Sequence, residues 1–203
     1  MKRITPGVLV AAVILSLVIG GIAGFVLGIA STRAGKAFIR GMVEAEKNAE
    51  VTHPQKLVRE KFELEYPSNW KIDAEDKDYD PDHMFSIDSP GNAFVMFVIG
   101  SGDTDPGDSL QSMIGRFEKV MSGPAIDRSE SYGRLTGKGA TMKGKILGIR
   151  TTVKLFAFSR DGLTIMITQQ CPDEDLNRVQ DGLALIERSF LLRTITDKRT
   201  PDQ

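Results

Sequence analysis

The stretch FELEYPSNWKI, Phe62 to Ile72, decides the fold class. Its first five residues alternate apolar and acidic side chains, which is the period of a half-buried strand. Pro67-Ser68-Asn69 has the composition of a turn, and Trp70, the lone tryptophan, then begins a second short apolar run. We therefore predict the first hairpin of an antiparallel sheet here, with Trp70 packed beneath a helix because large aromatic side chains are mostly core residues.

The rest of the chain contains further strand patterns and two helix patterns. Strands are expected at Phe85–Ile87, at the apolar run Ala93–Gly100 that should be covered on both faces, near Arg134–Met142, at Ile149–Ser159 and at Leu163–Gln170. Asp161-Gly162 has the composition of a hairpin turn. Apolar residues at helical spacing predict one helix that is capped near Asp108 and ends at Ser122-Gly123-Pro124, and a second that is capped at Asp173. Antiparallel strands covered by amphipathic helices predict an α+β sandwich.

Composition excludes several function classes. The 203 residues carry a net charge of −1, and 41% of them are hydrophobic. This describes an ordinary globular chain without the basic field that binds nucleic acid. Because Cys171 is the only cysteine, no intramolecular disulfide can form.

The N-terminal part is dominated by a charge-free apolar stretch. Gly7 to Ala30 contains no charged residue, and as a helix it would be about 36 Å long against roughly 30 Å of bilayer hydrocarbon. It is either a cleaved signal peptide, with small residues at Gly28-Ile29-Ala30 before a cut, or an uncleaved signal anchor. Its length favours the transmembrane anchor, because cleavable apolar regions run about 7–15 residues. We expect the N-terminus in the cytoplasm and the bulk of the chain outside it.

The predicted boundaries follow from these patterns. A stalk is expected after the anchor because apolar residues recur at helical spacing up to His53-Pro54. The predicted parts are 1–31, cytoplasmic tip and anchor; 32–60, helical or linker stalk; 61–192, folded domain; and 193–203, polar tail.

Candidate chemistry is sparse. The acidic loop 73–83 offers weak metal candidates in Asp78, Asp80, Asp82 and His83. The loop fails the EF-hand rule, because counting from Asp76 the sixth position is Pro81 instead of glycine, so a solvated loop is the favoured interpretation. No G-x-S-x-G elbow, P-loop or dinucleotide fingerprint occurs. We therefore assign no catalytic residue and no cofactor.

Two further features have a structural and a functional interpretation. Cys171 precedes a helix, where a thiol can become reactive, although a buried structural cysteine is the commoner case. The lysines and Arg134 of YGRLTGKGATMKGKILG could form a basic face for an acidic partner, although most charged side chains on strands are simply solvated.

The chain resembles the PsbP-like family. The resemblance rests on the FELEYPSNWKI stretch, MFSIDSPGNAFVMFVI, the midchain helix, LTIMITQQCP and the last helix ending in Ser189-Phe190. It covers about 61–192. The family includes the extrinsic PsbP subunit of photosystem II and a Ran-binding import factor. It implies an αβα sandwich around an antiparallel sheet and a role in protein binding or assembly, and it has no catalytic motif to carry over.

The leading hypothesis is therefore a membrane-anchored, extracytoplasmic module that binds a protein or assembles a complex. The alternative is a small-ligand-binding protein or an enzyme that uses a cleft between sheet and helix. A third hypothesis is a mainly structural oligomer that associates through the transmembrane helix.

Gly20, Gly24 and Gly28 share one face of the expected transmembrane helix, so two helices could approach closely there. If that face pairs, crosslinking in membranes should trap a dimer, and Gly24→Leu should weaken it because the larger side chain separates the helices. Capture of monomer alone would contradict the pairing.

Overall fold

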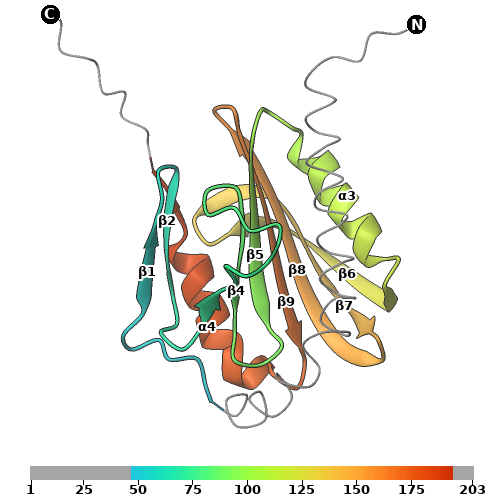
Figure 1. The fold of residues 1–203 in the computed structure, drawn as a ribbon. Coiled ribbons are helices and arrows are strands. Elements are labelled where there is room, and N and C mark those ends of the chain that lie inside the picture. Colours follow the sequence, from blue (N-terminus) through green and yellow to red (C-terminus); the bar gives the residue numbers. More distant parts are fainter. Residues whose placement is uncertain (1–46, 194–203) are drawn as a thin grey trace, which may run out of the picture.

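The computed structural model describes residues 47–193, which form two antiparallel sheets and two helices (Figure 1). The larger sheet has the order β3-β4-β5-β9-β8-β7-β6, and the smaller has the order β1-β2-β10. The strands are β1 (Gln55–Val58), β2 (Phe62–Tyr66), β3 (Lys71–Ile72), β4 (Met84–Asp88), β5 (Phe94–Ser101), β6 (Met121–Tyr132), β7 (Leu135–Ile146), β8 (Ile149–Arg160), β9 (Leu163–Pro172) and β10 (Leu191–Leu192). The helices are α3 (Pro106–Phe117) and α4 (Leu176–Ser189). The predicted α+β class with a central antiparallel sheet is confirmed.

The two helices cover opposite faces of the larger sheet. Strand β8 shows this by alternation, since Val153 and Leu155 pack with α3 in one apolar cluster, whereas Phe156 and Phe158 belong to the cluster that contains α4 and the smaller sheet. Side chains alternate between the faces of a strand, so a nearly continuous apolar run serves both cores.

Four phenylalanine rings join the two sheets. Phe62 on β2 stacks on Phe85 of β4 at 5.4 Å between ring centroids and on Phe190, just after α4, at 5.8 Å. Phe97 on β5 completes the group, 4.9 Å from Phe85 and 5.3 Å from Phe190. Stacking at these separations adds to the free energy of burying the rings.

The expected first hairpin is wrong, although both of its strands exist. Strand β2 pairs with β1 and β10, whereas β3 pairs with β4 in the other sheet. The turn after Pro67 is closed by a hydrogen bond from the Trp70 N–H to the Pro67 carbonyl, 3.0 Å long. Trp70 is 1% exposed and lies in the core. The strand that follows it, β3, belongs to the larger sheet.

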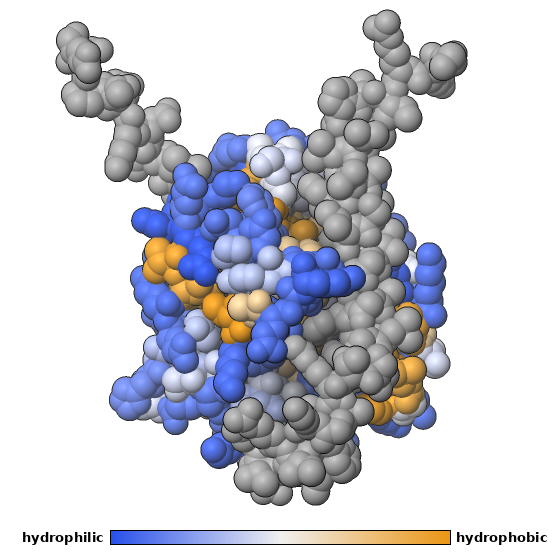
Figure 2. Space-filling view, viewed as in Figure 1, coloured by the Kyte–Doolittle hydropathy of each residue, from blue (hydrophilic) through white to orange (hydrophobic). Residues whose placement is uncertain are grey.

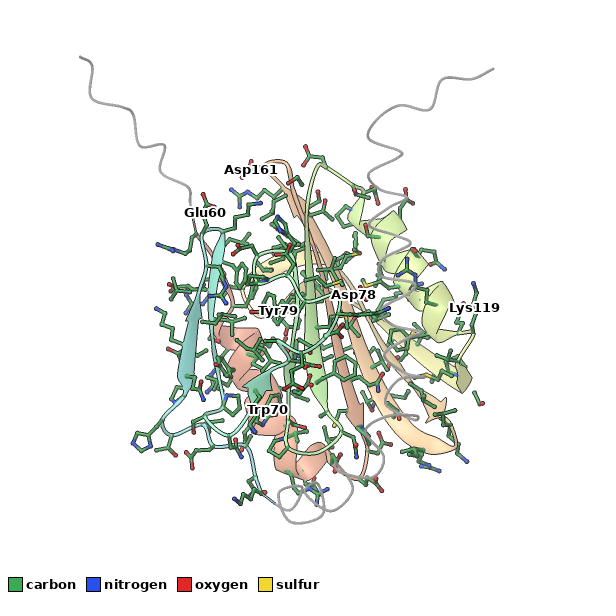
Figure 3. The ribbon with its side chains drawn as sticks, viewed as in Figure 1. Glu60, Trp70, Asp78, Tyr79, Lys119 and Asp161 are labelled. Atoms are coloured by element: carbon green, nitrogen blue, oxygen red, sulfur yellow. The ribbon has the colours of Figure 1, made fainter. Side chains whose placement is uncertain are left out.

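The packing of Trp70 beneath a helix is confirmed (Figure 3). A Cβ atom on Gly182 of α4 would lie 2.7 Å from Cζ2 of Trp70 and 2.7 Å from Cγ of Pro67. Since real Cβ atoms do not approach so closely, α4 can rest on the indole only because residue 182 has no side chain.

The stalk prediction needs correction over its described part. The prediction for residues 47–60 is a helix or a linker, but residues 55–58 form β1, which pairs with β2 from Gln55–Tyr66 to Val58–Glu63. Leu57 is buried in the core. Its neighbours in β1 are polar or exposed, so one inward residue in four gave too weak a period to identify the strand.

The helix ends also differ from expectation. Helix α3 is capped by Asp105, whose Oδ1 accepts hydrogen bonds from the N–H groups of Gly107 and Asp108, because Pro106 suits the first helical position. It ends at Phe117, and the expected stop at 122–124 lies in β6, where the pairing register shifts. Helix α4 begins after Asp175 instead of Asp173.

Neither helix within residues 47–193 has the length and apolarity to cross a bilayer. The predicted anchor at 7–30 and the polar tail from 194 lie outside the described residues. Asp161 and Gly162, with φ of 55° and 74°, form the predicted turn between β8 and β9.

Truncation of Phe62 should test whether the phenylalanine cluster holds the sheets together. Phe62→Ala should lower the free energy of unfolding by about 3–5 kcal/mol, because it removes a fully buried ring. Val58→Ala on the neighbouring strand is the control and should change it by less than about 0.5 kcal/mol. Urea unfolding followed by Trp70 fluorescence measures both, and equal effects would contradict the role of the cluster.

Candidate functional site

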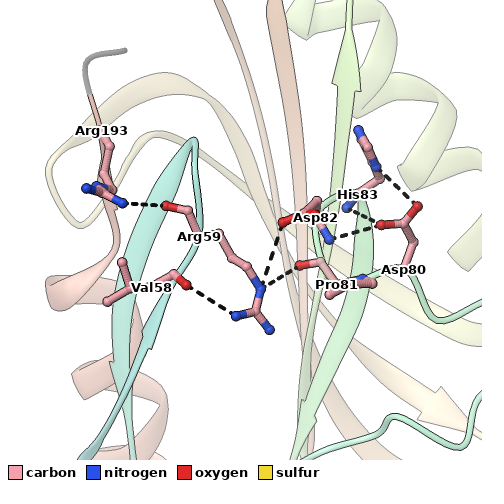
Figure 4. Close-up of polar contacts among 7 residues, drawn as sticks. All are labelled: Val58, Arg59, Asp80, Pro81, Asp82, His83 and Arg193. Atoms are coloured by element: carbon pink, nitrogen blue, oxygen red, sulfur yellow. Dashed lines mark hydrogen bonds and ion pairs between the residues drawn. The ribbon is translucent and has the colours of Figure 1, made fainter. Parts of the chain in front are cut away.

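The acidic loop contains a turn that is closed by the carboxylate of Asp80. Asp80 Oδ1 accepts hydrogen bonds from the N–H groups of Asp82 (3.0 Å) and His83 (3.2 Å), and its Oδ2 lies 3.1 Å from Nδ1 of His83 (Figure 4). The hydrogen bond from Asp82, followed by the contacts with His83, holds the pKa of Asp80 below its usual value. Asp80 therefore closes its own turn.

Arg59 crosses from the β1–β2 turn to this loop. Its Nε donates to the Pro81 carbonyl at 3.1 Å and lies 3.9 Å from Oδ1 of Asp82. Arg193, just beyond β10, donates in turn to the Arg59 carbonyl at 2.8 Å (Figure 4). Three segments far apart in the sequence meet at this polar rim.

Of the weak metal candidates, Asp80, Asp82 and His83 form these local contacts, whereas Asp78 does not. Asp78 carries a buried Oδ2 whose nearest cation is Nζ of Lys77, 3.8 Å away. Among residues 47–193, no group of three or more histidine, cysteine or acidic side chains is arranged to hold a metal ion. The roles seen for Asp80, Asp82 and His83 are those of loop ties.

Cys171 has the surroundings of a structural cysteine. It is 3% exposed, and its thiol donates to the Pro172 carbonyl at 3.2 Å. Burial, with smaller contributions from the nearby carboxylates of Asp175 and Asp173, raises the pKa of the thiol to about 12. Such a thiol holds almost no thiolate at neutral pH and is a poor nucleophile.

A polar cluster that sequence reasoning missed fixes α4 to the sheet. Lys154 Nζ lies 2.6 Å from Oε2 of Glu187 and 5.5 Å from the ring centroid of Tyr132. Gln169 donates to the Tyr132 hydroxyl at 2.9 Å, and burial raises the pKa of that hydroxyl. The four residues come from β8, α4, β6 and β9, so no sequence spacing could have revealed them.

The predicted basic face does not exist as one surface. Lys138 pairs with Glu130 at 3.1 Å. Arg134 lies in the β6–β7 turn, whereas Lys143 and Lys145 lie near the other end of β7. The cations are therefore divided between the two ends of the ribbon.

A small apolar hollow lies beside α3, over the central strands β5 and β9 of the larger sheet. Helix α3 packs mainly over β7 and β8 and touches β9 less. The hollow beside it is lined by Met96, Val98, Met113, Arg116, Phe117, Met166 and Thr168. Methionine, phenylalanine and arginine are the residue types enriched where proteins bind one another, and methionine adapts its shape to a partner.

Arg116 is the charged member of this lining. It is partly buried, and burial lowers the pKa of its guanidinium group. Its guanidinium group makes a long contact of 3.5 Å with Oγ of Ser112. It forms no ion pair with any carboxylate in the described part of the chain, so a partly desolvated cation faces an apolar hollow without an anion.

Sequence reasoning identified Met113 and Phe117 as core but missed Arg116 between them. It also treated Ala93–Gly100 as one buried run. The alternation of β5 places Phe97 and Ile99 in the core with α4 and leaves Met96 and Val98 on the other face. The sequence signal that could have indicated this hollow is Arg116, a charged residue between the apolar residues Met113 and Phe117 of α3.

Comparison with known proteins gives similarity at the level of structure only, because no family model and no curated protein matches the chain. One similar solved structure is Mycobacterium tuberculosis LpqN, involved in cell envelope biogenesis, with 16% identity and a TM-score of 0.46 over 72% of this chain and 99% of that one. Another is the Saccharomyces cerevisiae Ran-binding protein Mog1p, with 9% identity and a TM-score of 0.49 over 69% and 95%.

A third is the cyanobacterial PsbP protein from Synechocystis sp. PCC 6803, with 11% identity and a TM-score of 0.45 over 70% of this chain and 94% of that one. Two of these structures, the PsbP protein and the Ran-binding protein, are of the kinds named by the sequence resemblance, so the structural similarity agrees with it. At these identities it says nothing about activity.

Alkylation should test the surroundings of Cys171. In the folded protein at pH 8, iodoacetamide should modify Cys171 far more slowly than in the protein unfolded in urea, because the thiol is buried and protonated. Intact mass spectrometry over time measures both rates. Similar rates in the two states would show an accessible thiolate and contradict the structural role.

Proposed function

We propose that the chain is a membrane-anchored, protein-binding module whose folded domain lies outside the cytoplasm. The observation that carries the binding role is Arg116, a partly buried cation beside a methionine-lined hollow, which pairs with no carboxylate among residues 47–193. The anchoring and the location are supported by the charge-free stretch Gly7–Ala30.

The lining of the hollow indicates the chemistry of the partner. Met96, Met113 and Met166 would receive an apolar side chain, and their flexible thioethers can adjust to its shape. Arg116 would receive a carboxylate at the edge of the same contact, because a guanidinium group binds a planar carboxylate through two parallel hydrogen bonds. The partner should therefore present an acidic residue next to an exposed apolar one.

Membrane tethering would allow this contact to be weak. A domain held near its partner binds at a raised effective concentration, so a small hollow with one charged contact could suffice. A free soluble partner would require a larger buried area for a stable complex.

The alternative is that the same hollow holds a small amphiphile with an acidic head. Arg116 would then bind the head and the methionines the apolar part. This version predicts a small molecule that copurifies with the protein and is visible by native mass spectrometry.

Substitution of Arg116 tests the proposal. The full-length protein carrying Arg116→Gln should capture its partner about tenfold less in crosslinking and pulldown from native membranes, since a lost charged hydrogen bond costs about 1.5–3 kcal/mol. Arg128→Gln is the matched control, because Arg128 is exposed and contacts only Gln111 at 3.5 Å.

Equal capture by both variants would contradict the proposed contact. Loss of a copurifying small molecule in Arg116→Gln, with protein capture unchanged, would favour the amphiphile instead.

A further inference from the structure

Exposed apolar side chains gather at one end of the larger sheet. Val120 is 48% exposed, Leu147 79% and Ile149 50%. They are three of the five large exposed hydrophobic residues in the described part of the chain. The pairing of Met121 with Ile146 places Val120 beside the β7–β8 turn, and Figure 2 shows apolar surface at this lower right margin of the molecule.

The β7–β8 turn has leucine at a position with positive φ. Leu147 has a φ of 50° and is followed by Gly148 with a φ of 84°. Asn-Gly, Asp-Gly or Gly-Gly is preferred in two-residue turns of this kind, because leucine is disfavoured at positive φ. The side chain of Leu147 is almost fully exposed, so packing within the fold does not explain its presence.

Cations surround the apolar tip. Lys145 and Arg150 are direct cross-strand partners, and Lys143 lies two residues along β7 on the same face of the sheet. All three are exposed, and none forms an ion pair within residues 47–193. Like charges directly opposite each other on a sheet are destabilising.

No carboxylate within residues 47–193 lies within ion-pair distance of these cations. Asp173 is close in space, since its N–H donates to the Arg150 carbonyl at 2.9 Å, but its carboxylate accepts from the Thr152 hydroxyl at 3.0 Å. Lys119, which precedes Val120, adds a further cation at the same end of the molecule (Figure 3).

We propose that the β7–β8 tip, residues 143–150, docks into the interface of an anionic lipid bilayer. Leu147 and Ile149 would enter the boundary between headgroups and acyl chains, and Lys143, Lys145 and Arg150 would lie among the lipid phosphates. The tip is a protruding turn with apolar residues at its end and cations behind them, which suits a penetrable surface better than the folded surface of an acidic protein.

This inference goes beyond the proposed function, because it requires no protein partner. The expected anchor at 7–30 would bring a bilayer within reach, so a weak contact would be enough to fix how the domain faces the membrane. The face that bears Arg116 would then be held in one direction relative to the bilayer.

Site-specific labelling tests the docking. An environment-sensitive fluorophore is attached to the full-length protein through Leu147→Cys, in a Cys171→Ala background, and the protein is placed in nanodiscs. The label should enter an apolar environment on discs that contain phosphatidylglycerol and stay in water on discs of phosphatidylcholine alone. The same label at Val58→Cys, an exposed apolar site on β1, should stay in water on both.

Charge variants separate docking from other causes. Lys145→Gln with Arg150→Gln should lower the ratio of docked to undocked label about 25-fold, because each cation near an anionic surface contributes about fivefold. Arg134→Gln with Lys138→Gln, which removes the cations near the other end of β7, should leave the ratio unchanged. Arg116→Gln should also leave it unchanged, so failure of the protein-binding proposal would be recognised separately.

Leu147→Asn provides a check that is independent of folding defects. Asparagine accepts positive φ, so the melting temperature should stay the same or rise, while a label at Ile149→Cys should dock about tenfold less. A label that stays in water on both kinds of disc would overturn the proposal. So would docking that ignores the charge variants, or docking that appears only when an acidic protein is added.

Discussion

The contact between four phenylalanine rings holds the described fold together. Phe62, Phe85, Phe97 and Phe190 come from the smaller sheet, two strands of the larger sheet and the exit of α4. None of these elements could bury its apolar face alone, since a three-stranded sheet with a two-residue edge strand has little surface to bury. The rings convert two separate sheets into one core, and the position of α4 follows from them.

The polar contacts refine this arrangement. Lys154 and Glu187 fix the last turns of α4 to β8, and the Gln169–Tyr132 hydrogen bond lies beneath them. A buried polar network contributes when each member has a partner, and these members are all partnered. The cluster therefore acts as a structural clamp and leaves the surface features elsewhere to carry interactions.

Those surface features share an origin in how the larger sheet is covered. Helix α3 packs mainly over β7 and β8, and the hollow that contains Arg116 lies at its side, over β5 and β9. The long β7–β8 hairpin runs past the end of α3 and presents Leu147 to solvent. One surface has a partly buried cation and the other an apolar tip with exposed cations, and the two suit different partners.

Local patterns determined much of this protein. Alternation identified β2 and β4, and a continuous apolar run identified β5. Helical spacing identified both helices, and Asp161-Gly162 identified the turn between β8 and β9, because each of these signals depends on residues close in the sequence. The pairing of strands was not predicted correctly. The residues on either side of Pro67 were interpreted as one hairpin, but Trp70 is buried against Gly182 and β2 and β3 lie in different sheets.

The candidate sites show the same difference between local and long-range information. The acidic loop was visible in the sequence, whereas the isolation of Arg116, the tie from Arg59 to the loop and the exposure of Leu147 arise from contacts, or missing contacts, between residues far apart in the chain. Sequence periodicity indicates which face of a helix or strand is buried. Only the tertiary structure decides which other element packs against that face.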